Sequence, residues 1–465
     1  MMRISLRTVA EVTGGHLLRN GATIEIEGVS TDSRSLQPGE LFVPLRGENF
    51  DGHAFLSQAV AHGAVACLSE EVVGGLAVPV VQVEDSLKAL GDLAGFVRRS
   101  LSGPLIAITG SSGKTTCKEM LSSILGRTSP GLKSEGNFNN LIGVPLSLFR
   151  LQRQHQWAVI EMGMSGRGEI ARLAQIAKPQ VGIITNVGAA HLEQLGGITG
   201  VAMAKGELFI HLPVDGTAVI NADDPMVRQL PVANGVRKVL FGTGTDAAVR
   251  ATEIEADNGS VRFQLCLEQQ KFQVKLPIPG RHNVSNALAA AAAAHVIGID
   301  PVEIAAGLEE FRPCPGRMEL IELTDDIVLL DDSYNANPLS VRAALVALHD
   351  LGRPGQRIAV LGDMLELGAL AHELHEEIGQ VAAGLVDRLL VYGPRACSIA
   401  DGAIAGGLDQ QRVARFTTHD ELVRQLADII HPGDRILVKG SRGMQMERVI
   451  NLLCAMRQSL AANGS

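Results

Sequence analysis

The residues with the clearest chemical potential lie where a short apolar run is followed by a loop of small residues. The run at 106–108 predicts a buried strand, and the loop after it leads into Lys114 and Thr115 at the start of a helix. Backbone N–H groups of such a loop can cradle phosphate groups at a helix N-terminus. The lysine can reach terminal phosphates, and the threonine hydroxyl can bind Mg²⁺. The segment therefore predicts a site for ATP or a related nucleotide. The alternative is a helix N-cap that holds no ligand.

The spacing of this loop differs from that of the common P-loop, which has four residues between its two glycines. That spacing would require a glycine at position 108, where the chain has isoleucine. We therefore expect the shorter TGxxGKT form, and this form makes an ordinary ATPase or GTPase less favoured.

Two further side chains are candidates for metal binding. Glu161 follows a predicted strand at 157–160, and Mg²⁺ commonly bridges one or two carboxylates to substrate phosphates. The alternative for Glu161 is a solvated carboxylate at a strand end. His191 lies in the loop after a predicted strand at 181–185 and could ligate a second metal or orient a phosphate. A loop histidine taken alone is more often structural.

Lys205 falls on the apolar face of a predicted helix, together with Val201, Ala204, Leu208 and Phe209. Burial lowers the pKa of a lysine because it disfavours the charged form. A neutral amine can add CO₂, and the resulting carbamate could bind a metal. The alternative, which the sequence alone favours, is a lysine that extends its ammonium group to water.

Other polar residues are candidates for binding a nucleotide. Asn283 and Asn286 flank the predicted start of an Ala-rich helix. One of them fits an N-cap, and the other could bind a base or a ribose. Arg317 follows a turn rich in proline and glycine, where it suits either a bidentate phosphate contact or an interdomain salt bridge.

Two polar segments near the C-terminus follow predicted strands. The segment 331–337 carries adjacent aspartates, a tyrosine and two asparagines, which is more than a turn before a Pro-led helix requires. The segment 438–443 ends a strand in cationic groups that would suit a carboxylate-bearing substrate, or it is a solvated basic loop. The segments 30–34 and 45–53 near the N-terminus are polar loops that flank a strand.

The chain has 465 residues, which is too long for one core, and a prior of about 150 residues per domain suggests about three domains. We place them at 1–100, 101–312 and 313–465. Strands alternate with helices in the second and third blocks, and 247–278 has the alternation of antiparallel strands. The predicted fold is α/β in three domains: a small α/β N-terminal domain, a central P-loop-type domain with a mostly parallel sheet, and a Rossmann-like C-terminal domain.

Apolar runs give the positions of strands in the third block. They occur at 327–330, 358–361, 389–392 and 436–438. Helical stretches lie between them, which is the pattern of a Rossmann-like unit.

Composition narrows the possible partners and the compartment. A net charge of −9 without a long basic run argues against a nucleic-acid partner. Six scattered cysteines without a CxxC pair indicate a reducing cytosol. The N-terminus does not resemble a signal peptide, and the longest apolar stretch, 287–299, is too short to span a bilayer. We expect a cytoplasmic protein with no membrane insertion, and a monomer because no block shows a surplus apolar face.

Several motifs together resemble the Mur ligase family, the ATP-dependent amide-forming enzymes of bacterial cell-wall synthesis. They occur in order along nearly the whole chain: TGSSGKTT at 109–116, the strand end at Glu161, NVGAAHLEQLG at 186–196, AKGELF at 204–209, GRHNVSNALAA at 280–290 and DDSYNANP at 331–338. Within the family, the chain is most similar to the branch that joins D-alanyl-D-alanine to a UDP-N-acetylmuramoyl tripeptide. The motifs that carry this similarity are DSYNANP at 332–338, GDMLELG at 362–368 and KGSRGMQME at 439–447. The DNPR-type motif expected of the diaminopimelate-adding relative is missing.

The resemblance implies a role for each matching position. ATP would be bound by Thr109, Gly110, Ser111, Ser112, Gly113, Lys114, Thr115, Thr116, Asn286, Arg317 and Asp332. Thr115 and Glu161 would hold one Mg²⁺, and His191 with a carbamylated Lys205 would hold a second metal. Lys114, Glu161, His191 and Lys205 would form the catalytic set.

The resemblance also implies where the small-molecule substrates bind. The sugar nucleotide would contact the N-terminal domain at Thr31, Asp32, Ser33 and Arg34 and the central domain at Asn137 and Asn139. The C-terminal domain would bind the dipeptide and close on ATP, with Tyr334, Asn335 and Arg442 as substrate contacts. Two alternatives are a folylpolyglutamate synthase-like ligase and a P-loop switch ATPase. The motifs leave open whether residue three of the tripeptide is diaminopimelate or lysine.

Overall fold

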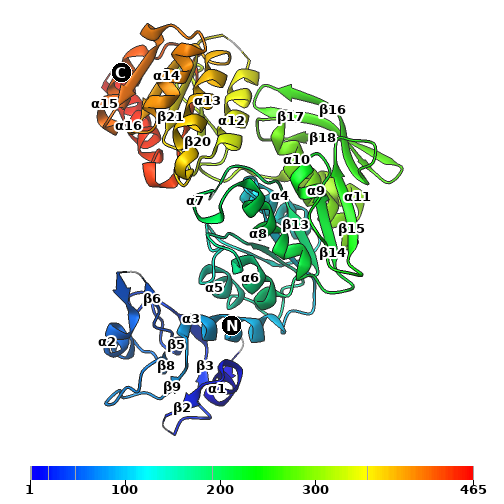
Figure 1. Ribbon diagram of the computed structural model, residues 1–465, viewed down its shortest axis with the longest axis vertical. Coiled ribbons are helices and arrows are strands. Elements are labelled where there is room, and N and C mark those ends of the chain that lie inside the picture. Colours follow the sequence, from blue (N-terminus) through cyan, green and yellow to red (C-terminus); the bar gives the residue numbers. More distant parts are fainter. Residues whose placement is uncertain (1–2, 19, 48, 191, 353, 464–465) are drawn as a thin grey trace.

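The computed structural model describes residues 3–18, 20–47, 49–190, 192–352 and 354–463, and the side chains up to 457. Its strands form three main sheets in three lobes, which follow one another along the chain from blue to red in Figure 1. All three lobes are α/β, as predicted. In the described parts of the chain, no helix combines the length and the apolar composition needed to cross a bilayer.

The N-terminal lobe contains a five-stranded sheet in the order β2-β9-β8-β5-β4, which is parallel except for β2. Its elements are β1 (Ile4–Ser5), α1 (Leu6–Thr13), β2 (His16–Leu17), β3 (Glu25–Ile26), β4 (Gly28–Ser30), β5 (Glu40–Phe42), β6 (Arg46–Gly47), β7 (Phe50–Asp51), η1 (Gly52–Phe55), α2 (Leu56–Ala61), β8 (Ala66–Ser69), β9 (Val80–Gln82) and α3 (Ser86–Arg98).

The central lobe contains a nine-stranded sheet in the order β11-β12-β10-β13-β14-β15-β16-β17-β18. Its elements are β10 (Leu105–Thr109), α4 (Lys114–Gly126), β11 (Leu132–Lys133), α5 (Gly143–Leu148), β12 (Ala158–Glu161), α6 (Glu169–Ala177), β13 (Val181–Ile184), α7 (Leu192–Leu195), α8 (Ile198–Ile210), β14 (Thr217–Asn221), α9 (Pro225–Arg228), β15 (Arg237–Gly242), β16 (Val249–Asp257), β17 (Ser260–Leu267), β18 (Gln270–Leu276), α10 (His282–Val296) and α11 (Pro301–Glu310). The first seven strands in this order pair in parallel, and β16 to β18 form the antiparallel extension predicted for 247–278.

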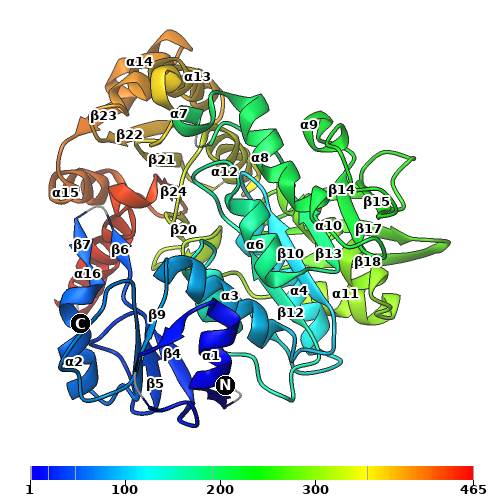
Figure 2. The ribbon, with the colours of Figure 1, turned by 60° about the horizontal axis from the view of Figure 1, so that its bottom comes forward.

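Helices cover both faces of the central sheet. Helices α4, α10 and α11 pack on one another, and α6 packs with α8 against the strands (Figure 2). The face of α4 that the sequence predicts to be apolar is fully buried: Cys117, Met120, Leu121, Ile124 and Leu125. The alanines at 287–294 of α10 are also buried, and their small side chains let this helix pack against α4 and the strands β14 to β16.

The C-terminal lobe contains a six-stranded sheet in the order β19-β20-β24-β21-β22-β23, in which only β19 is antiparallel. Its elements are β19 (Glu319–Glu322), β20 (Val328–Asp332), α12 (Pro338–Asp350), β21 (Arg357–Gly362), η2 (Gly368–Leu370), α13 (Ala371–Ala383), β22 (Arg388–Tyr392), α14 (Cys397–Ala405), η3 (Gln410–Arg412), β23 (Val413–Phe416), α15 (His419–Ile429), β24 (Arg435–Lys439), η4 (Arg442–Met444) and α16 (Glu447–Asn463).

The four strands predicted in this lobe are confirmed as β20, β21, β22 and β24. The sequence analysis missed β19 and β23. Both are edge strands whose residues are only partly buried, so neither has the continuous apolar run that marks the central strands.

Helix α3 connects the N-terminal lobe to the central lobe through a buried arginine. The side chain of Arg98 is 5% exposed and donates from Nε to the carbonyl of Ala177 at 2.8 Å and from Nη2 to Oε1 of Gln180 at 3.0 Å. Asp92 on the same helix forms an ion pair with Arg172 of α6 at 2.7 Å. These contacts join the two lobes along the length of α3.

Replacing the buried arginine should weaken this junction. We expect Arg98→Ala to reduce the free energy of unfolding by about 3 kcal/mol, because hydrogen bonds from a charged donor to the carbonyls of Ala177 and Leu101 and to Gln180 are lost. Thermal denaturation followed by circular dichroism measures the effect. Arg99→Ala is the matched control, since Arg99 is an exposed neighbour that stacks on Phe96. Equal unfolding temperatures for the two variants would contradict the role given to Arg98.

Candidate functional site

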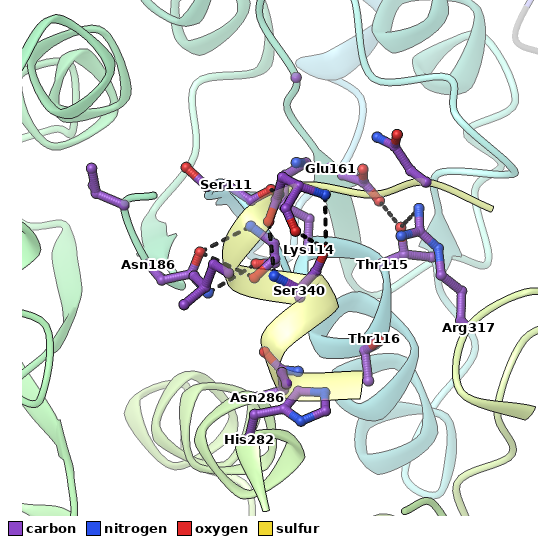
Figure 3. Close-up of a pocket in the computed structure, with 18 of the residues that line it drawn as sticks. Ser111, Lys114, Thr115, Thr116, Glu161, Asn186, His282, Asn286, Arg317 and Ser340 are labelled. Atoms are coloured by element: carbon purple, nitrogen blue, oxygen red, sulfur yellow. Dashed lines mark hydrogen bonds between the residues drawn. The ribbon is translucent and has the colours of Figure 1, made fainter. Parts of the chain in front are cut away.

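A cavity of about 720 Å³ lies between the central lobe and the C-terminal lobe. The loop after β10, the end of β12 and the end of β13 contribute to its lining, so it opens at the carboxyl edge of the parallel sheet. Ligands of α/β proteins bind at this edge because all the parallel strands end there. Figure 3 shows the side chains that converge in the cavity.

The loop between β10 and α4 is held by its neighbours. Asn186 Oδ1 accepts the backbone N–H of Ser112 at 2.9 Å, and the Thr185 hydroxyl donates to the carbonyl of Ser112 at 2.6 Å. Gly113 has φ +78°, and a Cβ there would lie 2.1 Å from Oδ1 of Asn286. Only glycine therefore fits this loop as it is packed.

The predicted nucleotide-binding residues divide into two groups. Ser111 to Thr116 line the cavity directly. Thr109 is fully buried, and neither it nor Gly110 is among the described residues that line the cavity. At Gly110 a Cβ would lie 1.9 Å from the Thr185 hydroxyl, so this glycine permits the close packing of the loop.

Lys114 begins helix α4, and its ammonium group donates to the carbonyl of Gly110 at 2.8 Å. Desolvation in the cavity lowers the pKa of Lys114, and Arg317 lowers it further, whereas the carboxylate of Glu161 opposes the shift. The cradle therefore places a lysine and an arginine close together, and a bound polyanion would relieve their repulsion.

Glu161 is the last residue of β12 and is 2% exposed, so it is not the solvated carboxylate of the alternative. The Thr115 hydroxyl donates to its Oε2 at 2.9 Å, and Nδ2 of Asn139 donates to its Oε1 at 2.8 Å. Hydroxyl and carboxylate oxygens are the ligands that Mg²⁺ prefers, and Mg²⁺ usually completes its shell with water and phosphate oxygens. In the parts of the chain that the structure describes, no three His, Cys, Asp or Glu side chains form a metal cluster. The Thr115 hydroxyl and the Glu161 carboxylate are suitable ligands for a magnesium ion that is also bound by a phosphate-bearing ligand.

Lys205 lines the same cavity from helix α8 and is 2% exposed. The alternative of an ammonium group in water is wrong, because the side chain of Lys205 is buried. Burial lowers the pKa of Lys205 well below its ordinary value, and the nearby charge of Lys114 lowers it further. His191, the other predicted ligand of a second metal, lies outside the described residues.

Neither asparagine of α10 is its N-cap, which corrects that interpretation. The capping position is Arg281, without a side-chain cap. Asn283 and Asn286 lie inside the helix and are 1% and 5% exposed. Asn283 donates to the carbonyl of Pro279 at 2.7 Å and accepts from Nδ2 of Asn286 at 3.0 Å. This pairing fixes the Asn286 amide against Gly113 in the loop between β10 and α4, which we call the phosphate loop.

Arg317 reaches the central lobe from the start of the C-terminal lobe. Its Nη2 lies 3.5 Å from the Thr115 hydroxyl, and its guanidinium carbon lies 4.0 Å from the centre of the Tyr334 ring. The guanidinium carbon of Arg442 lies 5.5 Å from the same ring. Among the described residues Arg317 forms no ion pair, so the structure does not contain the interdomain salt bridge considered for it.

Asp332 and Lys439 form a buried ion pair at the ends of β20 and β24. The distance from Nζ to Oδ2 is 2.5 Å, and Nζ also donates to the carbonyl of Asn335 at 2.9 Å. Burial raises the pKa of Asp332, while the charge of Lys439 opposes the shift. Lys439 is therefore not part of a solvated basic loop, although Arg442 of the same segment is exposed.

The predicted sugar-nucleotide residues of the N-terminal lobe do not line this cavity. Asp32 pairs with Arg34 at 2.7 Å, and the hydrogen bonds from Arg34 lower the pKa of Asp32 to about 2. Ser33 is buried and donates to Gln58, and Thr31 lies beside it after β4. Asn137 and Asn139, by contrast, line the cavity from the central lobe.

The sequence analysis assigned no individual role to several polar residues of the cavity. Asn186 holds the phosphate loop, and Asn337 donates to the carbonyl of Ser111 at 3.2 Å across the two lobes. His282 and Ser340 also line the cavity. Their sequence signal was weak because asparagine and serine are common at turns and helix starts. Asn337 is indeed the N-cap of α12, with Ser340 in a capping box.

The fold and this loop define an α/β protein of the P-loop class, with a small-residue cradle at a helix N-terminus beside a carboxylate of the adjacent strand. Three family models match the chain: the Mur ligase family catalytic domain at 25–98, the Mur ligase middle domain at 108–294, and the glutamate ligase domain of Mur ligases at 316–442. The chain belongs to the Mur ligase family.

Similar proteins match nearly the whole length of the chain. The UDP-N-acetylmuramoyl-tripeptide–D-alanyl-D-alanine ligase of Escherichia coli K12 is 40% identical over 97% of this chain and 99% of its own length. The crystal structure of MurF from Acinetobacter baumannii has a TM-score of 0.91 at 35% identity and covers 98% of this chain and 99% of that one. MurF ligase from Thermotoga maritima in complex with ADP has a TM-score of 0.83 at 29% identity, over 93% of this chain and 98% of that one.

A methyl group at Gly113 should disrupt the cradle without unfolding the protein. In Gly113→Ala the added methyl group would clash with Asn286. The residue would also have to keep a left-handed φ, which L side chains rarely adopt, so the loop must shift. We expect the Kd for ADP to rise at least about tenfold, which corresponds to roughly 1.4 kcal/mol. Isothermal titration calorimetry measures the change. Gly126→Ala, at the other end of α4, is the control because a Cβ there meets nothing within 4 Å. Equal ADP affinity in both variants would show that Gly113 does not shape the site.

Proposed function

We propose that this chain is an ATP-dependent ligase that joins D-alanyl-D-alanine to a UDP-N-acetylmuramoyl tripeptide, and that it acts as a cytoplasmic monomer in peptidoglycan precursor synthesis. The observation that carries the proposal is the single cavity in which the phosphate cradle, the Thr115–Glu161 pair and the buried Lys205 meet Arg317 of the C-terminal lobe. Full-length similarity to ligases of this name supports the choice of substrates.

In this proposal the triphosphate lies on the loop at 111–116, with its γ-phosphate towards Lys114 and Arg317. The two cations would stabilise the charge of the transferred phosphoryl group. Asn286 and Asp332 would bind the nucleoside, and Asp332 would then exchange its pairing with Lys439 for a ribose hydroxyl. Magnesium held by Thr115 and Glu161 would screen the phosphate charges as a second anion approaches.

The proposed reaction has two steps, a phosphoryl transfer to the tripeptide and an acyl transfer to the dipeptide. The terminal carboxylate of the tripeptide attacks the γ-phosphorus of ATP, so that ADP leaves and an acyl phosphate forms. The amine of D-alanyl-D-alanine then attacks the acyl carbon, phosphate leaves, and the amine proton passes to a base or to water. Phosphorylation is needed because an oxide ion is a poor leaving group. Water must be excluded from the acyl phosphate, which the C-terminal lobe would achieve by closing over the cavity.

Each lobe would bind one substrate or one part of a substrate. The N-terminal lobe, 1–100, would bind the uridine end of the sugar nucleotide through Thr31 to Arg34, outside the cavity. Asn137 and Asn139 of the central lobe, 101–312, would direct the peptide end towards Glu161. The C-terminal lobe, 313–465, would bind the dipeptide with Tyr334, Asn335 and Arg442, whose cation suits a carboxylate.

Lys205 would act as a carbamate. Its neutral amine adds to the carbon of CO₂, forming an N–C bond and releasing one proton to solvent. The product is a carboxylate on a long arm in the cavity, and together with His191 it would hold a second metal. The lowered pKa supports this assignment because only the neutral amine reacts.

The requirement for substrates tests the proposed activity. Purified protein with ATP and Mg²⁺ should release phosphate only when both the tripeptide nucleotide and D-alanyl-D-alanine are present, as measured by a coupled phosphate assay. Running the assay with diaminopimelate and lysine tripeptides determines which one is used. Phosphate release without the dipeptide would favour a switch ATPase, and release that depends on folate and glutamate would favour a folylpolyglutamate synthase-like ligase.

The carbamate can be tested separately. We expect Lys205→Ala to lower turnover by about 100-fold or more, because one stabilising group of the transition state is lost. A ¹³C NMR signal of a carbamate, observed with labelled CO₂, should be present in the wild type and absent in the variant. The signal should also weaken as the pH falls through the pKa of Lys205, since the protonated amine cannot add CO₂. Lys271→Ala, at an exposed lysine, should change neither result.

A further inference from the structure

A buried lysine on helix α4 has no part in the function proposed above. Lys118 lies one helical turn after Lys114, and its side chain is 1% exposed. Its Nζ donates to the carbonyl of Ser134 at 2.8 Å and lies 3.1 Å from Oε1 of Glu119. A buried ammonium group is costly unless it is paired and hydrogen-bonded, and Lys118 satisfies both conditions.

Ser134 connects this lysine to the carboxylate residue of the site. It follows β11 and is itself 1% exposed. Its hydroxyl oxygen accepts the backbone N–H of Glu161 at 3.0 Å, and its own N–H donates to the carbonyl of Val159 at 3.0 Å. One residue therefore separates the ammonium group of Lys118 from the backbone of Glu161.

The loop that begins at Ser134 returns to the same glutamate. Asn139 of this loop donates to Oε1 of Glu161 at 2.8 Å, and its carbonyl accepts the N–H of Gly163 at 2.8 Å. Thr115 of α4 donates to the other carboxylate oxygen at 2.9 Å. The contacts thus form a closed ring in which α4 reaches Glu161 by two routes, directly from Thr115 and through Lys118 and Ser134.

We propose that Lys118 is a positioning residue that sets the distance between Thr115 and Glu161, the two proposed magnesium ligands, by holding Ser134 against helix α4. The inference rests on the proposed function, which assigns magnesium to those two residues. A partner that orients metal ligands typically changes metal affinity by about 10- to 100-fold when it is removed.

The neighbouring Lys133 provides a matched control. It pairs with the other oxygen of Glu119 but is 45% exposed, and within the described part of the chain its ammonium group bonds to neither Ser134 nor Glu161. The two lysines therefore share one acidic partner, and only one of them is in the ring. Both Lys118→Met and Lys133→Met remove one positive charge beside Glu119, but only Lys118→Met removes the bond to Ser134. A difference in Mg²⁺–ADP affinity between the two variants therefore reports on that bond.

The experiment compares ADP binding with and without Mg²⁺ by isothermal titration calorimetry on the full chain. For Lys118→Met we expect the Kd of Mg²⁺–ADP to rise by about tenfold or more, whereas the Kd of metal-free ADP changes by less than about twofold. Lys133→Met should leave both values close to those of the wild type. Ser134→Ala, which removes only the hydroxyl acceptor, should reproduce the selective loss and decides the matter if Lys118→Met does not fold.

The outcomes separate this inference from the proposed function. If wild-type ADP binding does not depend on Mg²⁺, the assignment of the metal to Thr115 and Glu161 fails, and the role of Lys118 fails with it. If the wild type depends on Mg²⁺ but Lys118→Met weakens both forms of ADP equally, Lys118 only supports the fold. Unchanged Mg²⁺–ADP binding in Lys118→Met or in Ser134→Ala also overturns the inference.

Discussion

The hydrogen bond between the Thr115 hydroxyl and the Glu161 carboxylate, 2.9 Å long, is the interaction on which the site depends. It joins the first turn of α4 to the last residue of β12. That distance is possible because β10 and β12 are adjacent and parallel, so that the loop after one strand meets the end of the other. The rest of the cavity is arranged around this junction. The Asn139 amide holds the second carboxylate oxygen, and Arg317 approaches the same hydroxyl from the C-terminal lobe.

Buried charge gives the cavity its chemical character. Burial disfavours the charged forms of Lys205, Lys439 and Asp332. It therefore lowers the pKa of Lys205 and of Lys439, and it raises the pKa of Asp332. In such surroundings a charge interacts strongly with its neighbours because little water screens it. A cavity with Lys114 and Arg317 close together therefore favours the binding of a polyanion. The Asp332–Lys439 pair compensates its own charges.

The N-terminal and C-terminal lobes contact the central lobe at different places. Helix α3 attaches the N-terminal lobe to the central lobe through Arg98 and Asp92, away from the cavity. The C-terminal lobe touches the phosphate loop itself, through Asn337 and Arg317. A reactive acyl phosphate needs a site that opens for two large substrates and then excludes water, and separate lobes meet that need better than one rigid domain.

Local signals in the sequence were enough to predict the fold class, the main strands and the loop at 109–116. These signals are apolar runs, the 3.6-residue period of α4, and glycines at positions with fixed spacing. The sequence also placed Glu161 and Lys205 among the candidates. The folded structure was needed to show that Lys205 is buried, that Asn283 and Asn286 lie inside α10, and that Asp332 pairs with Lys439. Those properties depend on which distant elements pack together. Burial and pairing are set by neighbours that lie tens to hundreds of residues away, so no local pattern carries them.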